Sequence, residues 1–216
     1  MEKLLHILRR NKKSAESYWQ DFSYSFEDEA ATVATALMEL PVVWEHSCLQ
    51  KKCGACAMIV DGRPCLACDT KLVDLKNEKI TIEPLRKFPV VEDLLVDRSS
   101  MMEKLGELKV WFREDALGLE EDTAFEASKC LQCGLCLEVC PNFYPGGKFA
   151  GMAAMAPQAR IISKSSVDKK DEMAGNYKKS VYDGCGKSLA CRDICPAKIQ
   201  MENLLVKTAS KAVWKR

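Results

Sequence analysis

Hydrophobic and polar residues alternate in the first part of the chain, as they do in strands with one buried face. The alternation runs over residues 4–9 and again over residues 20–26, and it predicts a β-hairpin. Residues 27–40 then carry small and aliphatic side chains at helical spacing until Pro41 ends the pattern. Two further strands with their turns are expected at residues 57–64 and 79–83.

From residue 99 onward the periodicity is helical. Ser99 is suited to cap a first helix that has Glu103 in its first turn. Further helices are predicted at residues 122–129, 149–163 and 199–214. The tract 164–179 is charged and turn-prone, which predicts a solvated connection. The pattern therefore predicts an α+β protein with a strand-rich domain over residues 1–100 and a helical domain over residues 101–216.

Composition changes this picture in one respect, the twelve cysteines among 216 residues. A formal net charge of +1 gives no field that would attract nucleic acid, so none is expected as a partner. No apolar run approaches about 18 residues, and the first residues lack a cleavage site, so neither a membrane span nor a signal peptide is expected. We therefore expect a reducing compartment, in which the thiols are metal ligands rather than disulfides.

The densest cysteine motif lies in the helical part and has the spacing C-x2-C-x2-C-x3-C-P. It consists of Cys130, Cys133, Cys136 and Cys140, followed by Pro141. In bacterial ferredoxins with this spacing, the first three thiolates bind one [4Fe–4S] cluster and the fourth binds another. Further cysteines must then complete two clusters, and a C-x5-C-x3-C-P motif supplies Cys185, Cys191 and Cys195. Zinc also binds C-x2-C pairs, but a zinc site does not explain why a fourth cysteine follows at this spacing with a proline directly after it.

A second cysteine motif lies in the strand-rich part. It has the spacing C-x4-C-x2-C and consists of Cys48, Cys53 and Cys56. With one more cysteine, this is the plant-type [2Fe–2S] spacing. Cys65 and Cys68 are both candidates for the fourth ligand, and spacing alone does not choose between them. Gly54 suits a loop that curls around a cluster and directs N–H groups at its sulfurs. Strands, one helix and a Cys-rich loop together predict a β-grasp ferredoxin fold.

Taken together, these motifs resemble the iron–sulfur subunit of succinate dehydrogenase or fumarate reductase over nearly the whole chain. The segment S-C-L-Q-K-K-C-G-A-C-A-M is similar to that family's S-C-R-E-G-x-C-G-S-C-A-M, and residues 84–99 resemble its link between domains. The L-A-C ending on Cys68 implies that this residue is the fourth [2Fe–2S] ligand. The resemblance thus implies [2Fe–2S] on Cys48, Cys53, Cys56 and Cys68, [4Fe–4S] on Cys130, Cys133, Cys136 and Cys195, and a third cluster on Cys140, Cys185 and Cys191.

The third cluster is expected to differ from its neighbour. Ser188 stands where the ferredoxin pattern would place a ligand, and with three thiolates the family's usual cluster is [3Fe–4S]. Eleven cysteines are then used, and only Cys65 is left over. The chain departs from the family at three places. Leu49–Lys52 replace the family's residues between the first two cysteines, and Tyr144–Pro145 stand where quinone-linked relatives often carry two tryptophans. Gly186 stands where some relatives have a histidine. The first departure is expected to alter the [2Fe–2S] potential, and the other two the quinone contact.

The resemblance implies an electron-transfer subunit of an oxidoreductase complex at the inner face of the cell membrane. A flavoprotein partner with FAD would exchange a hydride with succinate or fumarate, and electrons would pass through three clusters to quinone in a membrane anchor subunit, with or without haem. The chain has no Gly-rich nucleotide loop, Ser-His or paired-carboxylate motif, so no catalytic residue is predicted in it. The alternative is an adaptor for another flavoprotein or a heterodisulfide-type thiol reductase, without quinone.

Overall fold

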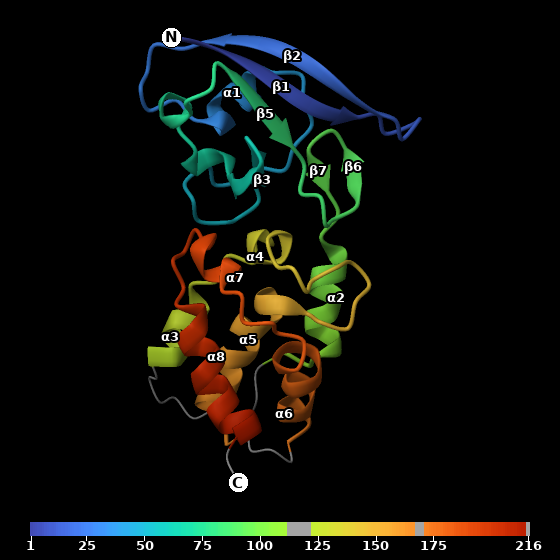
Figure 1. Cartoon of the computed structure of the whole chain (residues 1–216), viewed down its shortest axis with the longest axis vertical. Coiled ribbons are helices and arrows are strands. Elements are labelled where there is room, and N and C mark those ends of the chain that lie inside the picture. The colour runs from blue at the N-terminus through green and yellow to red at the C-terminus, as the bar shows by residue number, and fades with distance from the viewer. Residues whose placement is uncertain (112–121, 167–170, 215–216) are drawn as a thin grey trace. The chain divides into compact units, whose positions relative to one another are not determined.

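The protein divides into two compact units, Met1–Arg98 and Ser99–Arg216 (Figure 1). This computed structural model describes residues 1–111, 122–166 and 171–214. The first unit is built on strands and the second on helices. Within the described ranges, no helix is long and apolar enough to cross a membrane.

A five-stranded mixed sheet organises the first unit, in the order β2-β1-β5-β3-β4. The strands are β1 Glu2–Arg10, β2 Ser17–Ser25, β3 Ala57–Val60, β4 Arg63–Leu66 and β5 Lys79–Glu83. Strand β1 is antiparallel to β2 and parallel to β5, so the N-terminal hairpin and a much later strand share one sheet (Figure 1). Alternate residues on β1 and β5 are fully buried, as the sequence pattern predicts; they are Leu5, Ile7, Ile80 and Ile82.

Helix α1, Val33–Glu39, is shorter than the predicted segment 27–40 because its start is set by local hydrogen bonds. The Thr32 hydroxyl accepts from the Thr35 backbone N–H, and the Thr35 hydroxyl accepts from the Thr32 N–H, which closes a capping box. Before this cap, the Asp28 carboxylate accepts from a backbone N–H at 2.8 Å and holds a turn. The predicted start at residue 27 is therefore wrong, whereas the apolar face of the helix is buried as expected.

The segment after β5, expected as a link, forms a second small sheet of β6 Val90–Glu92 and β7 Leu95–Val96. At its turn Asp93 is only 3% exposed. Arg9 of β1 donates to both Asp93 carboxylate oxygens, at 3.0 Å and 2.8 Å, and the Val43 N–H donates at 2.9 Å. The carboxylate is thus satisfied from two sides, and it ties the β6–β7 hairpin to the main sheet.

Substituting Asp93 by alanine is expected to lower the free energy of unfolding of the first unit by about 3 kcal/mol, because the Arg9 guanidinium loses its buried partner. Urea unfolding followed by circular dichroism measures the change. Asp21→Ala is the matched control, since Asp21 pairs with Lys79 where both side chains are about half exposed. A loss no larger for Asp93→Ala than for this exposed pair would contradict the role assigned to the buried carboxylate.

The second unit is a helical assembly around a central helix. Its α-helices are α2 Ser99–Glu107, α3 Asp122–Ser128, α4 Leu135–Glu138, α5 Gly151–Lys164, α6 Glu172–Tyr177, α7 Ala190–Asp193 and α8 Met201–Ala209. Helix α5 packs against α3, α6 and α8, and its residues from 151 to 156 are all buried (Figure 1). The predicted C-terminal helix is confirmed, and it continues as a π-helical turn at Ser210–Trp214.

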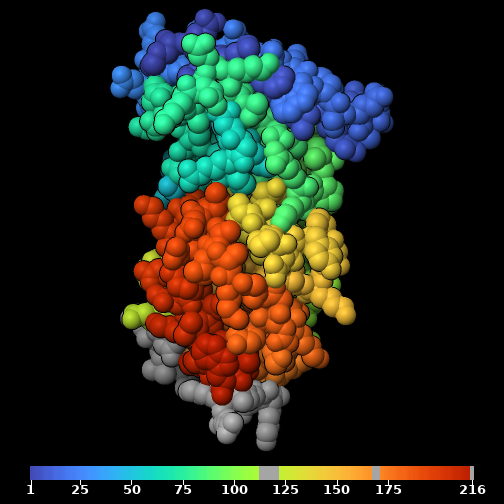
Figure 2. Space-filling view, in the orientation of Figure 1, coloured from blue at the N-terminus to red at the C-terminus, as the bar shows by residue number. Residues whose placement is uncertain are grey.

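The charged tract 164–179 does not run as a solvated connection over its whole length. Residues 167–170 lie outside the described residues, but helix α6 follows and buries Met173 and Tyr177 against the core. Asp171 caps this helix by accepting from the Met173 N–H at 2.8 Å. The apolar face of α6 is short, and the many charged residues around it obscure its helical spacing in the sequence. On the surface, α6 and the C-terminal segment lie side by side, in orange and red (Figure 2).

Candidate metal centres

Four thiols of the first unit converge from two segments. Cys48, Cys53 and Cys56 lie in the loop between α1 and β3, and Cys68 lies in the 3₁₀ turn Ala67–Asp69 after β4. The Cys56 and Cys68 sulfurs are 3.3 Å apart. Cys53 interacts with Cys48 and with Cys56. The loop curls tightly, and Gly54 has a positive φ of 75°, which a residue without a Cβ adopts readily.

Backbone N–H groups of the same loop point at these sulfurs. The N–H groups of Gln50 and Lys52 donate to Cys48 Sγ at 3.4 Å and 3.3 Å, and the Lys51 N–H donates to Cys68 Sγ at 3.3 Å. The hydrogen bond from Gln50, followed by those from the Cys53 thiol and Lys52, lowers the pKa of Cys48 to about 7. Donors of this kind favour the thiolate, which is the form that binds iron.

Cys65 is placed differently. It lies on β4 opposite Met58 of β3, before the 3₁₀ turn that redirects the chain. Burial raises the pKa of its thiol, and the groups around it are Thr70, Arg63 and the Val60 backbone. The structure therefore brings Cys68 into the group of four and leaves Cys65 among packed residues, where a neutral thiol behaves as a small hydrophobe.

Seven thiols of the second unit form two neighbouring groups. Burial raises the pKa of Cys136 well above its usual value, and the thiols that add to this effect are Cys133, Cys130, Cys191 and Cys195. Burial likewise raises the pKa of Cys191 to about 11, with further contributions from Cys185 and Cys140. Thiols thus gather around both Cys136 and Cys191, and Cys191 is itself among the thiols that raise the pKa of Cys136. Among the residues that the structure describes, no three His, Cys, Asp or Glu side chains are placed to bind a single metal ion.

A cavity lies at the second of these groups. It is small, about 20 Å³, and partly open, and Cys140, Cys185, Cys191, Ser188 and Asn142 are among the residues that line it. The Asn142 amide donates to the Gly184 carbonyl at 2.7 Å and joins the two loops that carry these cysteines. Three thiols lining one cavity suit an iron–sulfur cluster with three protein ligands.

The structure adds one polar contact that sequence reasoning missed. The Gln132 amide, on a residue with φ of 53°, donates to Cys130 Sγ at 3.1 Å and to the Ala153 carbonyl at 3.0 Å. Nothing in the cysteine spacing indicates such a donor, because the second partner is on α5, twenty-one residues away. A hydrogen bond to a ligating sulfur is one of the means by which a protein tunes a cluster.

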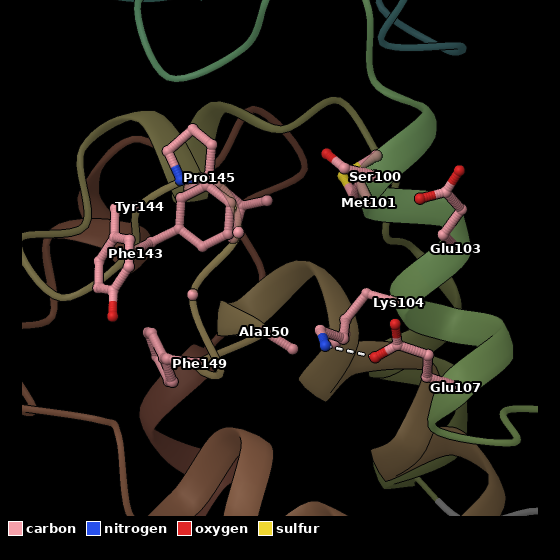
Figure 3. Close-up of a pocket in the computed structure, with 14 residues that line it drawn as sticks. Ser100, Met101, Glu103, Lys104, Glu107, Phe143, Tyr144, Pro145, Phe149 and Ala150 are labelled. Atoms are coloured by element: carbon pink, nitrogen blue, oxygen red, sulfur yellow. Dashed lines mark hydrogen bonds and ion pairs between the residues drawn. The ribbon is translucent and has the colours of Figure 1, made fainter.

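An open pocket of about 200 Å³ lies in the second unit, between α2 and the loop before α5 (Figure 3). Figure 3 shows Tyr144 and Pro145 on one side and the ion pair of Lys104 with Glu107 on the other. Tyr144 is 64% exposed. Tyr144 and Pro145, which stand in place of the two tryptophans of quinone-linked relatives, thus line one pocket. Leu137 of α4, the residue after Cys136, lines the same pocket.

Both units match known iron–sulfur families. Residues 4–103 match the family described as a 2Fe-2S iron-sulfur cluster binding domain, and residues 126–199 match a 4Fe-4S dicluster domain. A [2Fe–2S] ferredoxin domain followed by a helical dicluster domain defines a multi-cluster electron-transfer protein. These matches confirm the predicted fold class and the expected [2Fe–2S] and [4Fe–4S] cofactors.

Relatives then identify the particular family. The chain is 33% identical to the succinate dehydrogenase iron-sulfur subunit of Bacillus subtilis, over 90% of this chain and 86% of that protein. It is 28% identical to the fumarate reductase iron-sulfur subunit of Wolinella succinogenes, over 79% and 77%. Its fold matches a chain of the Mycobacterium smegmatis Sdh1 complex with a TM-score of 0.80 at 24% identity, over 97% and 96%. This chain belongs to the family of succinate dehydrogenase and fumarate reductase iron–sulfur subunits, which are electron-transfer subunits of a larger complex.

Proposed function

We propose that this chain relays single electrons between the FAD of a flavoprotein subunit and a quinone held by a membrane anchor subunit. The supporting observation is that cysteines converge within each unit: Cys48, Cys53, Cys56 and Cys68 lie near one another in the first, and Cys136 and Cys191 of the second each lie near further thiols. When bound, the clusters supply one-electron redox chemistry. The dicarboxylate site belongs, in this proposal, to the flavoprotein, and the complex lies at the inner face of the cell membrane.

We assign eleven of the thiols to three ligand sets. In our proposal the domain of residues 1–100 holds [2Fe–2S] through Cys48, Cys53, Cys56 and Cys68. The domain of residues 101–216 holds [4Fe–4S] through Cys130, Cys133, Cys136 and Cys195, and [3Fe–4S] through Cys140, Cys185 and Cys191. The cavity lined by Ser188 supports an open corner at the third cluster, because a neutral hydroxyl is a poor iron ligand beside thiolates.

The chain's own residues set the conditions for transfer. Backbone N–H groups of residues 50–52 and the Gln132 amide donate to ligating sulfurs, which stabilises added negative charge on the reduced clusters. Burial of Cys136 and Cys191 keeps water away from the second and third sites. The exposed Tyr144 and the adjoining pocket provide a surface for the anchor subunit close to the third site.

Anaerobic purification of the native complex tests this proposal. We expect about nine iron atoms per chain and little zinc, because three clusters of these types bind two, four and three irons. We also expect a flavoprotein with FAD and a hydrophobic subunit to co-purify, and crosslinks from the region of Tyr144 to reach the hydrophobic subunit. Stoichiometric zinc with only a few irons would contradict the cluster assignment.

The same experiment separates this proposal from its alternative. The alternative is an adaptor that transfers electrons without quinone. It is supported by Tyr144–Pro145 and Gly186, which replace residues expected to lie at the quinone contact of quinone-linked relatives. A fully soluble complex that reduces fumarate without quinol, with a Cys-rich partner in place of a hydrophobic subunit, would establish the adaptor. Three clusters with a co-purifying anchor and quinone-dependent turnover would establish the electron relay.

A further inference from the structure

Arg98 reaches back from the end of the first unit to the cysteine loop. Its Nη1 donates to the Gly54 carbonyl at 3.2 Å, and its Nη2 donates to the Ala55 carbonyl at 2.6 Å. Nη2 also lies 2.9 Å from Glu45 Oε2. The Arg98 side chain is 13% exposed, so these contacts are largely shielded from solvent. Both carbonyls belong to the short stretch between Cys53 and Cys56.

These contacts fix two peptide planes. A trans peptide carries its C=O and the following N–H on opposite sides, and the chain has no cis peptide bond among the described residues. When Arg98 holds the carbonyls of Gly54 and Ala55, the N–H groups of Ala55 and Cys56 must point away from Arg98. Gly54, with φ of 75°, is free to adopt the backbone conformation that this orientation needs.

We propose that Arg98 is a positioning residue for the [2Fe–2S] site, which directs the Ala55 and Cys56 N–H groups toward the bound cluster and raises its reduction potential. The inference rests on the proposed ligands Cys53 and Cys56. Donors aimed at the cluster favour the more negative, reduced state. Glu45 offsets part of the arginine charge, so the orientation of the two peptides, rather than the charge alone, is the main contribution. The planar fork of arginine serves two acceptors at once, which a lysine ammonium does not reproduce.

The test compares Arg98→Gln, Arg98→Lys and the parent in the purified complex, by redox titration of the [2Fe–2S] EPR signal. For both variants we expect the equilibrium constant for one-electron reduction to fall about three- to tenfold, which lowers the midpoint by about 30 to 60 mV. Electron–nuclear double resonance should also lose couplings to exchangeable amide protons. Lys79→Gln is the control, since it removes one positive charge from an ion pair with Asp21 on the sheet; its midpoint should match the parent.

Each result decides the inference. If the [2Fe–2S] signal is present and the equilibrium constant for reduction stays within twofold of the parent in both Arg98 variants, the proposed role of Arg98 is overturned, whereas the ligand assignment stands. An unchanged Arg98→Lys beside a lowered Arg98→Gln would show that charge suffices and would overturn the positioning role. If Arg98→Gln does not assemble, Arg98→Lys gives the answer. A parent complex without a [2Fe–2S] signal overturns the ligand assignment as well, so the two failures are distinguishable.

Discussion

Cys68→Ser is expected to abolish or strongly shift the [2Fe–2S] EPR signal of the complex, while Cys65→Ser leaves it intact. The two thiols are three residues apart, but the 3₁₀ turn Ala67–Asp69 directs only Cys68 to the loop, where its sulfur lies 3.3 Å from that of Cys56. Removing a ligating thiolate takes away a quarter of the protein ligands of that cluster. Spin quantitation and iron analysis of the two variants measure the effect.

Cys65→Ser is the matched control, because it makes the same sulfur-to-oxygen change nearby. It places a hydroxyl among packed residues, with Thr70 and the Val60 backbone near enough to hydrogen-bond. Folding should therefore be largely retained. If Cys65→Ser loses the signal and Cys68→Ser keeps it, the ligand has been assigned to the wrong cysteine.

Ser188→Cys is expected to convert the third cluster from [3Fe–4S] to [4Fe–4S]. Ser188 lines the same cavity as Cys140, Cys185 and Cys191, so a thiolate there supplies the missing fourth ligand. The oxidised complex should lose its EPR signal near g of about 2, gain about one iron per chain, and show a lower midpoint for this cluster, because potential depends on cluster type and charge. Electron transfer to the terminal acceptor should slow, whereas reduction of artificial acceptors at the flavin survives.

The control for this conversion is Ser210→Cys. Ser210 lies on the C-terminal π-helical turn, where its hydroxyl donates to the Lys207 carbonyl, and it does not line the cavity. This variant should keep the parent signal and iron content. An oxidised parent complex that already lacks the [3Fe–4S] signal would instead indicate that the Ser188 oxygen binds a fourth iron, and our assignment of the third cluster would be wrong.

The sequence predicted most of the first unit. The β1–β2 hairpin, β5 and the apolar face of α1 all follow from alternation or helical spacing, which depend on residues close together in the chain. The errors occurred where a side chain competes with the pattern. Asp28 and Thr32 delay the start of α1, and Asp171 starts a helix inside a charged tract. A helix cap depends on one polar side chain, so it leaves little trace in the periodic pattern of hydrophobic residues.

Local spacing also determined the chemistry of the metal centres. Within C-x2-C-x2-C the chain is too short to place its thiols far apart, so the cluster class can be inferred before any fold is known. Long-range contacts, in contrast, were decided only by the tertiary structure. Three such contacts connect residues between 21 and 84 positions apart. They are the ion pair of Arg9 with Asp93, the hydrogen bond of the Gln132 amide to α5, and the hydrogen bonds of Arg98 to the cysteine loop. No spacing rule encodes them, because they depend on how separate elements pack.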